Sequence, residues 1–465
     1  MAKQLFQTPT GMHDILPEEQ PYWEKVRQVV FELAKFYDFG LVETPILESL
    51  GVFERTLGVS SDVVEKGMYT LKTKGGDELV LRPENTASIM RAYLQYGWEV
   101  LPQPVKVFYL GQMFRHESPQ AGRFRQFHQF GMEILGSEDP VSDAQLIQLA
   151  MVALGDLGIK GLICEVNSLG DKVCRIKYRQ ALKDYFRYSI KKMCSDCQRR
   201  FKVNPLRILD CKEEKCREII IKSPQILDFI CDDCRNQFKK LLEFLDELDI
   251  PYLLNPHLVR GLDYYNRTVF EIYVVRNKTS DEDTPKDIVP STSLDGTRDK
   301  SLEASPSIKP EAGLEEKRGA QSALISGGRY DGLAELLGGK NVPAAGFAGG
   351  IERIIADMKE VKARVPQRGQ PKVFLVQLGD LAKKRSLKIM EEFRKEDIWV
   401  GESVSRHSIK SQMKIADKLN VKLALISGQK EALDKEIIIR DMTSGMQETI
   451  PLSKLISEVK KRLKS

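Results

Sequence analysis

Apolar residues follow two different periods in the N-terminal part of the chain. Spacing by three and four predicts a long amphipathic helix that ends at Gly40, with an apolar face made of Val26, Val29, Val30, Leu33, Ala34 and Tyr37. The following segment, 41–48, is extended and contains Pro45, which suits a sheet edge or an interface better than a central strand.

Further along, the pattern predicts a mixture of strands and helices. Residues 105–115 and 124–135 read as two strands around a polar loop. Residues 140–160 and most of 170–250 read as helix, the latter rich in charge. From Pro371 onward, short strands alternate with helices, which indicates a separate α/β domain. Its strands are expected at 372–378, 422–426 and 436–440, and its helices near 381–395, 408–420 and 451–464.

Composition bounds these expectations. A chain of 465 residues predicts about two or three domains. It has no run of the ~18 apolar residues that a membrane span requires, and its N-terminus lacks the apolar core of a signal peptide, so we expect a cytoplasmic protein that does not enter membranes. The net charge of +5 is small, which permits a polyanionic partner but does not require one.

Residues 276–320 break the pattern. They contain no aromatic residue and are dominated by Ser, Thr, Pro, Asp, Glu and Lys. Such a composition predicts a disordered segment. Because it separates two strands that should pair, it would form a long hairpin tip. An inert insertion is the favoured interpretation, with RNA or protein binding as the alternative.

Cysteines cluster in the helical region. Six of the eight fall between 194 and 234, while Cys164 and Cys174 stand apart. In a reducing compartment this clustering favours metal over disulfides. Two C-x2-C pairs predict one structural zinc site with tetrahedral thiolate ligands, namely Cys194, Cys197, Cys231 and Cys234. Cys211 and Cys216 leave the choice of ligands open, and metal-free packing of reduced thiols is the alternative.

Polar groups concentrate in a few short strings. The stretch 258–271 reads Leu-Val-Arg-Gly-Leu-Asp-Tyr-Tyr-Asn-Arg-Thr-Val-Phe-Glu, with apolar ends typical of a strand. On the expected strand 124–135, Gln129 and Glu133 share one face with Gly131 between them, which describes the floor of a small polar pocket. The Glu133 carboxylate suits a free ammonium group, and Glu84 beside Thr86 is a second candidate.

The 258–265 string resembles the histidine-recognition signature of histidyl-tRNA synthetases, and Gly-Gly-Arg-Tyr-Asp-Gly at 327–332 resembles their second one. The helix and extended segment before residue 48 resemble motif 1 of class II synthetases. Motif 2 is matched by Phe-Arg-His-Glu at 114–117 with 122–127, and motif 3 by the glycine-rich 344–354. Residues 204–211 resemble the insertion domain of bacterial synthetases, and 409–419 resemble an anticodon-binding domain.

This resemblance implies an α+β fold. An antiparallel catalytic sheet flanked by helices would occupy 1–365, interrupted by the helical, Cys-rich insertion domain at 170–250 and by the 276–320 segment. An α/β anticodon-binding domain would follow at 370–465. Motif 1 implies a homodimer.

The implied activity is that of a histidine–tRNA ligase. ATP, with Mg²⁺, activates L-histidine to histidyl-adenylate, and the histidyl group is transferred to the 3′ end of tRNA(His). Arg115 and Arg260 would flank the α-phosphate, where planar guanidinium groups meet developing negative charge. No general base is required, because the attacking carboxylate is already ionised.

Residue by residue, the resemblance assigns three further groups. The residues expected to bind histidine are Glu84, Thr86, Gln129, Glu133, Tyr264, Tyr265 and Tyr330. Those expected to bind ATP are Arg115, Glu117, Arg123, Arg260 and Arg353. Binding of tRNA falls to Arg123, Arg125, Lys410 and Lys414, with Lys418 on the same helix face, although an ordinary solvated face would also explain these lysines.

Two other classes of protein share such strings. One is a non-catalytic regulatory paralogue that partners ATP phosphoribosyltransferase, and the other is an RNA-binding sensor of uncharged tRNA. Either should lose the signature arginines, whereas Arg115, Arg260 and Arg353 are all present here.

Overall fold

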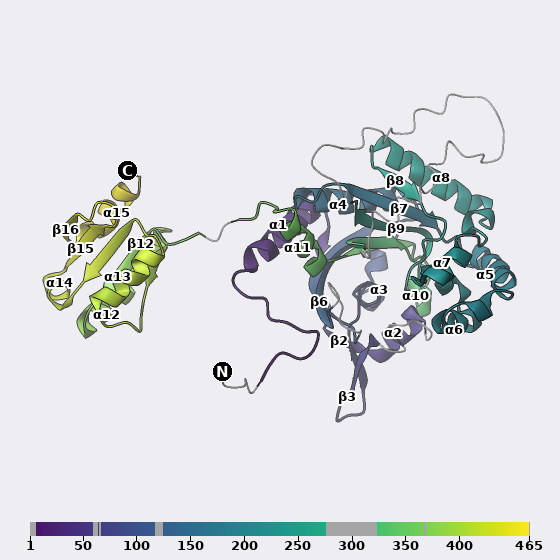
Figure 1. Cartoon of the computed structure of the whole chain (residues 1–465), viewed down its shortest axis with the longest axis horizontal. Coiled ribbons are helices and arrows are strands. Elements are labelled where there is room, and N and C mark those ends of the chain that lie inside the picture. Colours follow the sequence, from purple (N-terminus) through teal and green to yellow (C-terminus); the bar gives the residue numbers. More distant parts are fainter. Residues whose placement is uncertain are drawn as a thin grey trace. The chain divides into compact units, whose positions relative to one another are not determined.

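The computed structural model describes residues 6–58, 64, 67–116, 124–275, 323–366 and 369–464. The chain divides into two compact units, Met1–Pro366 and Gln367–Ser465 (Figure 1). The predicted 276–320 insertion lies outside the described residues, as do Glu117 and Arg123.

The first unit is built on an eight-stranded sheet with the order β1-β5-β6-β11-β10-β9-β7-β8. All neighbours from β5 to β7 are antiparallel, and only the outer pairs β1–β5 and β7–β8 are parallel. The strands are β1 (Gly40–Leu41), β5 (Val105–Phe114), β6 (Gln126–Leu135), β7 (Leu162–Ser168), β8 (Tyr252–Leu254), β9 (Asn266–Val274), β10 (Ile325–Arg329) and β11 (Ala344–Gly350). The predicted α+β class with an antiparallel catalytic sheet is confirmed.

Helices cover both faces of this sheet because alternate strand residues are apolar on each side. One face packs against α1 (Gln20–Phe36), α4 (Pro140–Asp156), α11 (Ile351–Glu360) and the apolar side of α8 (Asp232–Glu247). The other packs against α2 (Leu50–Leu57), α3 (Thr86–Gln95) and α10 (Leu333–Leu336). A small sheet of β2 (Leu47–Ser49), β3 (Tyr69–Lys72) and β4 (Glu78–Leu81) lies beside α2.

The first helix confirms the predicted apolar face, since Val26, Val29, Val30 and Ala34 are buried. Its predicted end at Gly40 is wrong. The helix ends at Phe36, and Asp38 takes the left-handed conformation with φ +61°. Asp tolerates that conformation better than most residues, so Gly40 is free to begin β1. The predicted extended segment 41–48 is divided, with Pro45 lying between β1 and β2.

Region 170–250, the predicted insertion domain, is mainly helical, as its sequence predicts. It comprises α5 (Lys172–Phe186), α6 (Ser195–Val203), the 3-10 helix η4 (Pro205–Asp210), α7 (Glu214–Ile220) and α8, with shorter 3-10 turns between them. Figure 1 shows these teal helices gathered beside the β9-β7-β8 end of the sheet. Their small core includes cysteine side chains among Tyr, Leu, Ile and Phe.

The second unit is a five-stranded sheet with the order β13-β12-β14-β15-β16. The predicted strands are confirmed as β12 (Val373–Gln377), β14 (Leu423–Ser427) and β15 (Glu436–Asp441), and the predicted helices as α12 (Asp380–Lys395), α13 (Ile409–Lys418) and α15 (Leu455–Lys464). Helix α15 begins later than predicted, because residue 451 closes a strand. Sequence patterning missed the edge strands β13 (Val400–Glu402) and β16 (Gln447–Pro451), and the short α14 (Gln429–Asp434).

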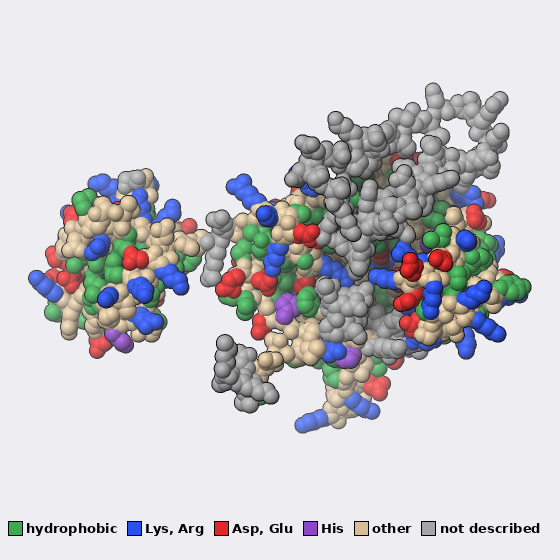
Figure 2. Space-filling model, viewed as in Figure 1, with side chains coloured by type: hydrophobic (Ala, Val, Ile, Leu, Met, Phe, Trp, Pro, Cys, Tyr) green, Lys and Arg blue, Asp and Glu red, His purple; other side chains and the backbone are tan. Residues whose placement is uncertain are grey.

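Basic and acidic side chains are interspersed on the face of each unit that Figure 2 shows. Within the described residues, no helix combines the length and apolar character that a bilayer span requires.

Candidate active site

The centre of the site is Glu133, a fully buried carboxylate on β6. Gly346 of β11 stands directly opposite it in the sheet. A Cβ atom on Gly346 would lie 1.5 Å from Glu133 Oε2, so only glycine leaves room for this carboxylate. The two strands therefore build a polar cavity floor inside an otherwise apolar sheet.

A second carboxylate lies close to the first. Glu84, just before α3, accepts hydrogen bonds from the backbone N–H groups of Thr86 (2.7 Å) and Ala87 (2.9 Å). The Thr86 hydroxyl donates to Glu133 Oε1 over 2.8 Å. Thr86 thus connects Glu84 to Glu133 through its backbone on one side and its hydroxyl on the other.

Three phenols enclose these acids. The ring of Tyr264 lies 4.7 Å from that of Tyr265 and 5.8 Å from that of Tyr330, centroid to centroid. The Tyr330 hydroxyl donates to Glu133 Oε2, and the Tyr264 hydroxyl donates to Glu84 Oε2 over 3.5 Å. All three tyrosines are buried. The structure therefore brings together the predicted histidine-binding residues Glu84, Thr86, Glu133, Tyr264, Tyr265 and Tyr330.

The electrostatics of the pocket favour a cationic ligand. Burial raises the pKa of Glu133 to about 8, although hydrogen bonds from Tyr330 and Thr86 oppose the shift and the charge of Glu84 adds to it. Burial likewise raises the pKa of Glu84. Among the described residues, no lysine or arginine forms an ion pair with either acid. An ammonium group would supply the missing charge.

Tyr109 on β5 is a pocket residue that sequence reasoning missed. It is buried, and its hydroxyl has no partner among the described residues. Its ring fills the space opposite Gly131, where a Cβ atom would lie 2.6 Å from it. The glycine beside Glu133 was the available signal, since a strand glycine indicates close approach by a neighbour. The predicted Gln129 is half-buried in the same strand as Glu133, and its buried Oε1 also has no described partner.

Arg115 ends the predicted motif 2 strand. Its backbone N–H donates to the carbonyl of Arg125 over 2.8 Å and closes the β5–β6 hairpin. Its Nε donates to the Pro83 carbonyl over 2.8 Å, and its guanidinium lies 5.3 Å from the centre of the Phe127 ring. This arginine is thereby fixed close enough to Glu84 for its charge to oppose the rise in that acid's pKa.

Arg260 lies in an irregular loop rather than in a strand. The apolar start of the 258–271 string predicted a strand there, but residues 258–265 form neither helix nor strand, and β9 begins only at Asn266. Leu258 is buried by side-chain packing instead of sheet pairing. Arg260 forms an ion pair with Glu271 of β9, and its guanidinium lies 5.5 Å from the centre of the Tyr265 ring. Burial lowers the pKa of Arg260, but the charge of Glu271 and the neighbouring tyrosines together raise it by more, so the net shift is upward and the group remains charged.

Motif 3 has the predicted form, a glycine-rich strand β11 followed by α11. Arg353, in the first turn of α11, donates to the Ala323 carbonyl over 3.4 Å. The preceding Glu352 accepts from the backbone N–H of His128 at 2.8 Å and contacts its Nδ1 at the same distance. Glu352 thereby ties the helix to β6 and determines where Arg353 lies.

The predicted tRNA-binding residues fall in two places. The side chain of Arg125 packs over Gly11, where a Cβ atom would lie 2.8 Å from its Cγ. Lys410, Lys414 and Lys418 are exposed on α13 of the second unit. The two groups belong to different units, and their use by one tRNA stays a prediction.

The predicted zinc ligand set is wrong, because its two C-x2-C pairs lie in different clusters. Cys194 and Cys197 gather with Cys211 and Cys216, whereas Cys231 and Cys234 gather with Cys174 and Asp171. Cys174, predicted to stand apart, is therefore part of a cluster. The helices of the insertion domain bring each C-x2-C pair to a nearer neighbour than the other pair.

An antiparallel sheet carrying motifs 1, 2 and 3, joined to an α/β unit, defines a class II aminoacyl-tRNA synthetase with an anticodon-binding domain. The family model described as histidyl-tRNA synthetase matches residues 11–170, and the one described as anticodon binding domain matches 372–462. The histidine–tRNA ligase of Dehalococcoides mccartyi is 41% identical over 459 residues, which is 99% of this chain and 100% of that protein.

The histidine–tRNA ligase of Pelotomaculum thermopropionicum is 38% identical, with 98% and 97% of the two chains covered. The apo histidyl-tRNA synthetase of S. aureus has a similar solved structure, with a TM-score of 0.73, 32% identity and coverage of 98% and 99%. A solved Bacillus halodurans C protein titled ATP phosphoribosyltransferase regulatory subunit/histidyl-tRNA synthetase, at 18% identity and TM-score 0.59, shares the fold alone. The chain belongs to the histidyl-tRNA synthetase family, as its sequence predicts.

Proposed function

We propose that this chain catalyses the histidine–tRNA ligase reaction. L-Histidine and ATP give histidyl-adenylate and pyrophosphate, and the histidyl group then passes to the 3′-terminal ribose of tRNA(His). The observation that carries the proposal is the pair of buried acids, Glu84 and Glu133, enclosed by tyrosines and bordered by Arg115 and Arg260. The reaction would take place in the cytoplasm, where tRNA is charged.

The amino acid is held by its two ends. Its α-ammonium group pairs with Glu133, with Glu84 and the Thr86 hydroxyl close by. A neutral imidazole has one donor and one acceptor. The phenols of Tyr264, Tyr265 and Tyr330 and the amide of Gln129 are the polar groups available to it, and the unpartnered Tyr109 hydroxyl joins them.

Adenylate formation then depends on fixed positive charge. ATP enters as its Mg²⁺ complex, and the histidine carboxylate attacks the α-phosphate. Arg115 and Arg260 stabilise the negative charge that develops on the phosphoryl oxygens, because both guanidinium groups are held by neighbouring groups before the substrate arrives. Arg353 stacks on the adenine or binds the γ-phosphate. Glu117 and Arg123 complete the predicted ATP site from outside the described residues.

Transfer requires the tRNA to reach both units. Arg125 and Arg123 are proposed to contact the acceptor end, and Lys410 and Lys414 the anticodon arm through its phosphates. The exposed α13 face makes these lysines available to a polyanion.

A homodimer is the proposed assembly. The motif 1 region exposes large apolar side chains, with Phe31 44%, Leu41 46% and Ile46 41% accessible. Phe31 and Leu41 both lie next to Phe108, by ring contact and by strand pairing, and this apolar surface is the one proposed to meet the second copy.

Histidine-dependent exchange of pyrophosphate into ATP tests the activity. The full-length protein should support exchange with L-histidine and not with the other amino acids. A regulatory paralogue or an uncharged-tRNA sensor would show no exchange, and that result would contradict the proposal.

A further inference from the structure

The insertion domain contains two clusters of cysteine side chains. The inner cluster, so called because its residues lie between those of the other along the sequence, contains Cys194, Cys197, Cys211 and Cys216. The outer cluster contains Asp171, Cys174, Cys231 and Cys234. Within each cluster, the four donor atoms all lie within 4.8 Å of one another. Asp171 and Cys174 have the spacing of a C-x2-C pair in which the first ligand is a carboxylate. Each cluster thus joins two short sequence pairs from different helices.

The inner cluster has the dimensions of a tetrahedral thiolate site. The Sγ atoms of Cys194 and Cys211 are 3.7 Å apart, and ligands at the usual Zn–S distance would be about 3.8 Å apart. A disulfide requires about 2.05 Å. Backbone N–H groups donate to Cys194 Sγ from Cys197 (3.5 Å) and to Cys216 Sγ from Cys194 (3.2 Å), which is the outer-shell support that thiolate ligands receive.

The outer cluster repeats this arrangement. The backbone N–H of Cys231 donates to Cys174 Sγ over 3.1 Å, and Cys231 Sγ lies 3.7 Å from Asp171 Oδ2. The other carboxylate oxygen, Oδ1, caps α5 by accepting from the Cys174 N–H over 2.8 Å. Asp171 is therefore oriented by the helix, with one oxygen directed at the thiols.

We propose that each cluster binds one zinc ion, so that the insertion domain holds two. Thiolates select zinc among the common divalent cations, and a closed set of four protein ligands is the arrangement of a structural site. The domain needs such support, because its core is small and consists in part of the cysteines themselves.

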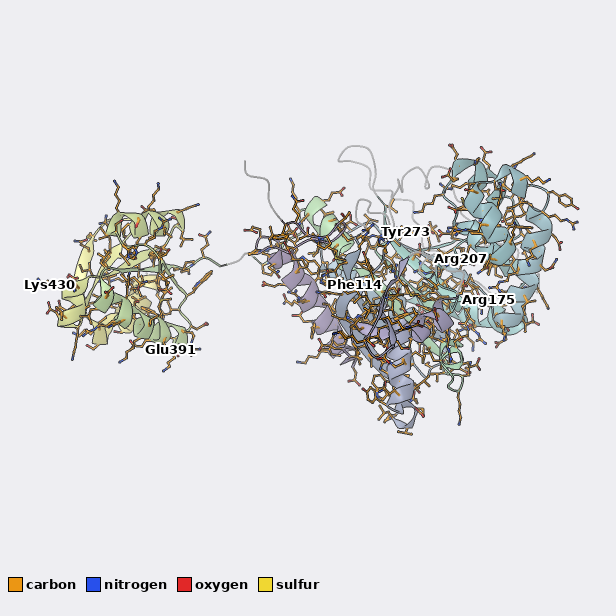
Figure 3. All side chains as sticks on the ribbon, turned by 90° about the horizontal axis from the view of Figure 1, so that it is seen from below. Phe114, Arg175, Arg207, Tyr273, Glu391 and Lys430 are labelled. Atoms are coloured by element: carbon orange, nitrogen blue, oxygen red, sulfur yellow. The ribbon has the colours of Figure 1, made fainter. Side chains whose placement is uncertain are left out.

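Each zinc site adjoins an arginine that holds the 258–265 loop. Arg175, next to the outer ligand Cys174, donates to the carbonyls of Tyr265 (2.8 Å) and Asp263 (3.3 Å). Arg207, on η4 between inner ligands, donates to the Gly261 carbonyl and lies 3.7 Å from Asp263 Oδ1. Figure 3 shows both arginines where the insertion domain meets the rest of the unit.

The two ions therefore act at a distance on the histidine pocket. The loop lines a cavity of about 640 Å³ through Asp263 and Tyr264, together with Arg175. Its apolar residues pack in the core of the first unit, and the hydrogen bonds from Arg175 and Arg207 hold its backbone carbonyls on the side of the insertion domain. Zinc would position the loop by fixing the segments that carry these arginines. Arg175 and Arg207 are positioning residues, and this consequence rests on the proposed function.

Metal content of the full-length protein tests the two sites. Protein prepared with reductant and without chelator should contain two zinc ions per chain by mass spectrometry of the metal. Cys211→Ser and Cys234→Ser should each lose one ion. Cys164→Ala, a buried cysteine of β7 outside both clusters, should keep both. Cobalt added to chelator-stripped wild-type protein should give thiolate-to-metal charge-transfer absorption that saturates at two ions, which decides the question even if a variant fails to fold.

Other outcomes overturn the assignment. Absence of zinc and of the cobalt absorption would show reduced, metal-free packing, and iron with a brown chromophore would show an iron–sulfur cluster. If the wild-type protein contained one zinc ion, which Cys234→Ser kept and Cys211→Ser lost, the inner site would stand and the outer site would be wrong.

The proposed positioning role of Arg207 is tested separately, through KM for histidine. Arg207→Ala should keep both zinc ions but raise KM for histidine about tenfold or more, since a charge-assisted hydrogen bond contributes about 1.5–3 kcal/mol. Cys211→Ser should lose one ion and raise KM in the same way. An unchanged KM in both would end the positioning role while leaving zinc binding intact. Absence of exchange in the wild type would end the proposed function and leave the metal result standing.

Discussion

At the scale of single residues, the main feature of the proposed histidine pocket is a carboxyl group that is buried away from solvent. Glu133 has hydrogen-bond donors on both oxygens, from Thr86 and Tyr330, but no cationic partner among the described residues. Burial raises the pKa of such a carboxyl group, and a cation that binds beside it favours the ionised form. Substrate binding and the protonation of Glu133 are therefore linked.

Glu133→Gln should weaken histidine binding and also reduce the dependence of protein stability on pH. The pKa of Glu133 is raised from 4.5 to about 8 in the folded chain, so its contribution to stability is complete at low pH and is lost as the pH rises through about 8. Without ligand, the thermal unfolding midpoint of the wild type should fall as the pH rises from about 4.5 to about 8 and level off above that, and the midpoint of the variant should fall less. Histidine binding should weaken by about 2–5 kcal/mol.

Thermal unfolding monitored by circular dichroism across this pH range, with isothermal titration of histidine, measures both effects. Glu243→Gln, exposed on α8, is the matched control and should follow the wild type. Identical pH slopes for wild type and Glu133→Gln would show that Glu133 is ionised in the free protein.

Arg260→His should leave the fold intact but slow adenylate formation by ~10²–10³-fold, because the transition state loses a fixed guanidinium donor. The new side chain also leaves Glu271 without its arginine, so unfolding should be measured in parallel. Rapid-quench measurement of adenylate formation gives the rate. A rate within about threefold of the wild type would assign Arg260 a structural role.

At the scale of elements, the antiparallel pairing of β5, β6 and β11 builds the pocket. The pairing places Gly131 opposite Tyr109 and Gly346 opposite Glu133, so two large polar side chains occupy the space that two glycines leave. The register of the sheet, and not any single strand, determines which groups meet.

Gly346→Ala should therefore damage the histidine site, because the added methyl group overlaps the Glu133 carboxylate. The neighbouring Gly350→Ala is the control, since a Cβ there meets only the Arg353 side chain, at 3.9 Å. Affinity for histidine should fall at least about tenfold in Gly346→Ala and little in Gly350→Ala. Equal affinities in the two variants, from titration calorimetry, would show that Glu133 can move aside without loss.

At the scale of the whole molecule, activation and tRNA recognition belong to different units. The first unit holds Glu133, Arg115, Arg260 and Arg353 with its own apolar cores, and the second has a separate core around β12, β14 and β15. A chain divided in this way predicts that the two steps of the reaction can be separated.

Truncation after Val365 should preserve histidine-dependent exchange and sharply reduce charging of tRNA(His), because the contacts from Lys410 and Lys414 are removed. Exchange and aminoacylation are compared at matched concentrations of truncated and full-length protein. Equal charging by the two would contradict the anticodon-binding role of the second unit.

Much of the molecule follows from short-range pattern. The apolar face of α1, the β5–β6 hairpin, the glycine-rich β11 before α11, and the strings around Arg115, Arg260 and Tyr330 are each contiguous in the sequence. Local periodicity and local motifs suffice for such features, because the groups that define them are neighbours along the chain.

Only the tertiary structure decided which distant groups meet. It grouped Cys174 and Asp171 with Cys231 and Cys234, turned 258–265 into a loop held by Arg175 and Arg207, and placed the Tyr109 hydroxyl among the acids. No local spacing contains this information, because strand register and helix packing set these distances. The sequence by itself therefore determined the family and the fold class and predicted which residues carry the chemistry, while packing determined the partners of these residues and the shape of the pocket.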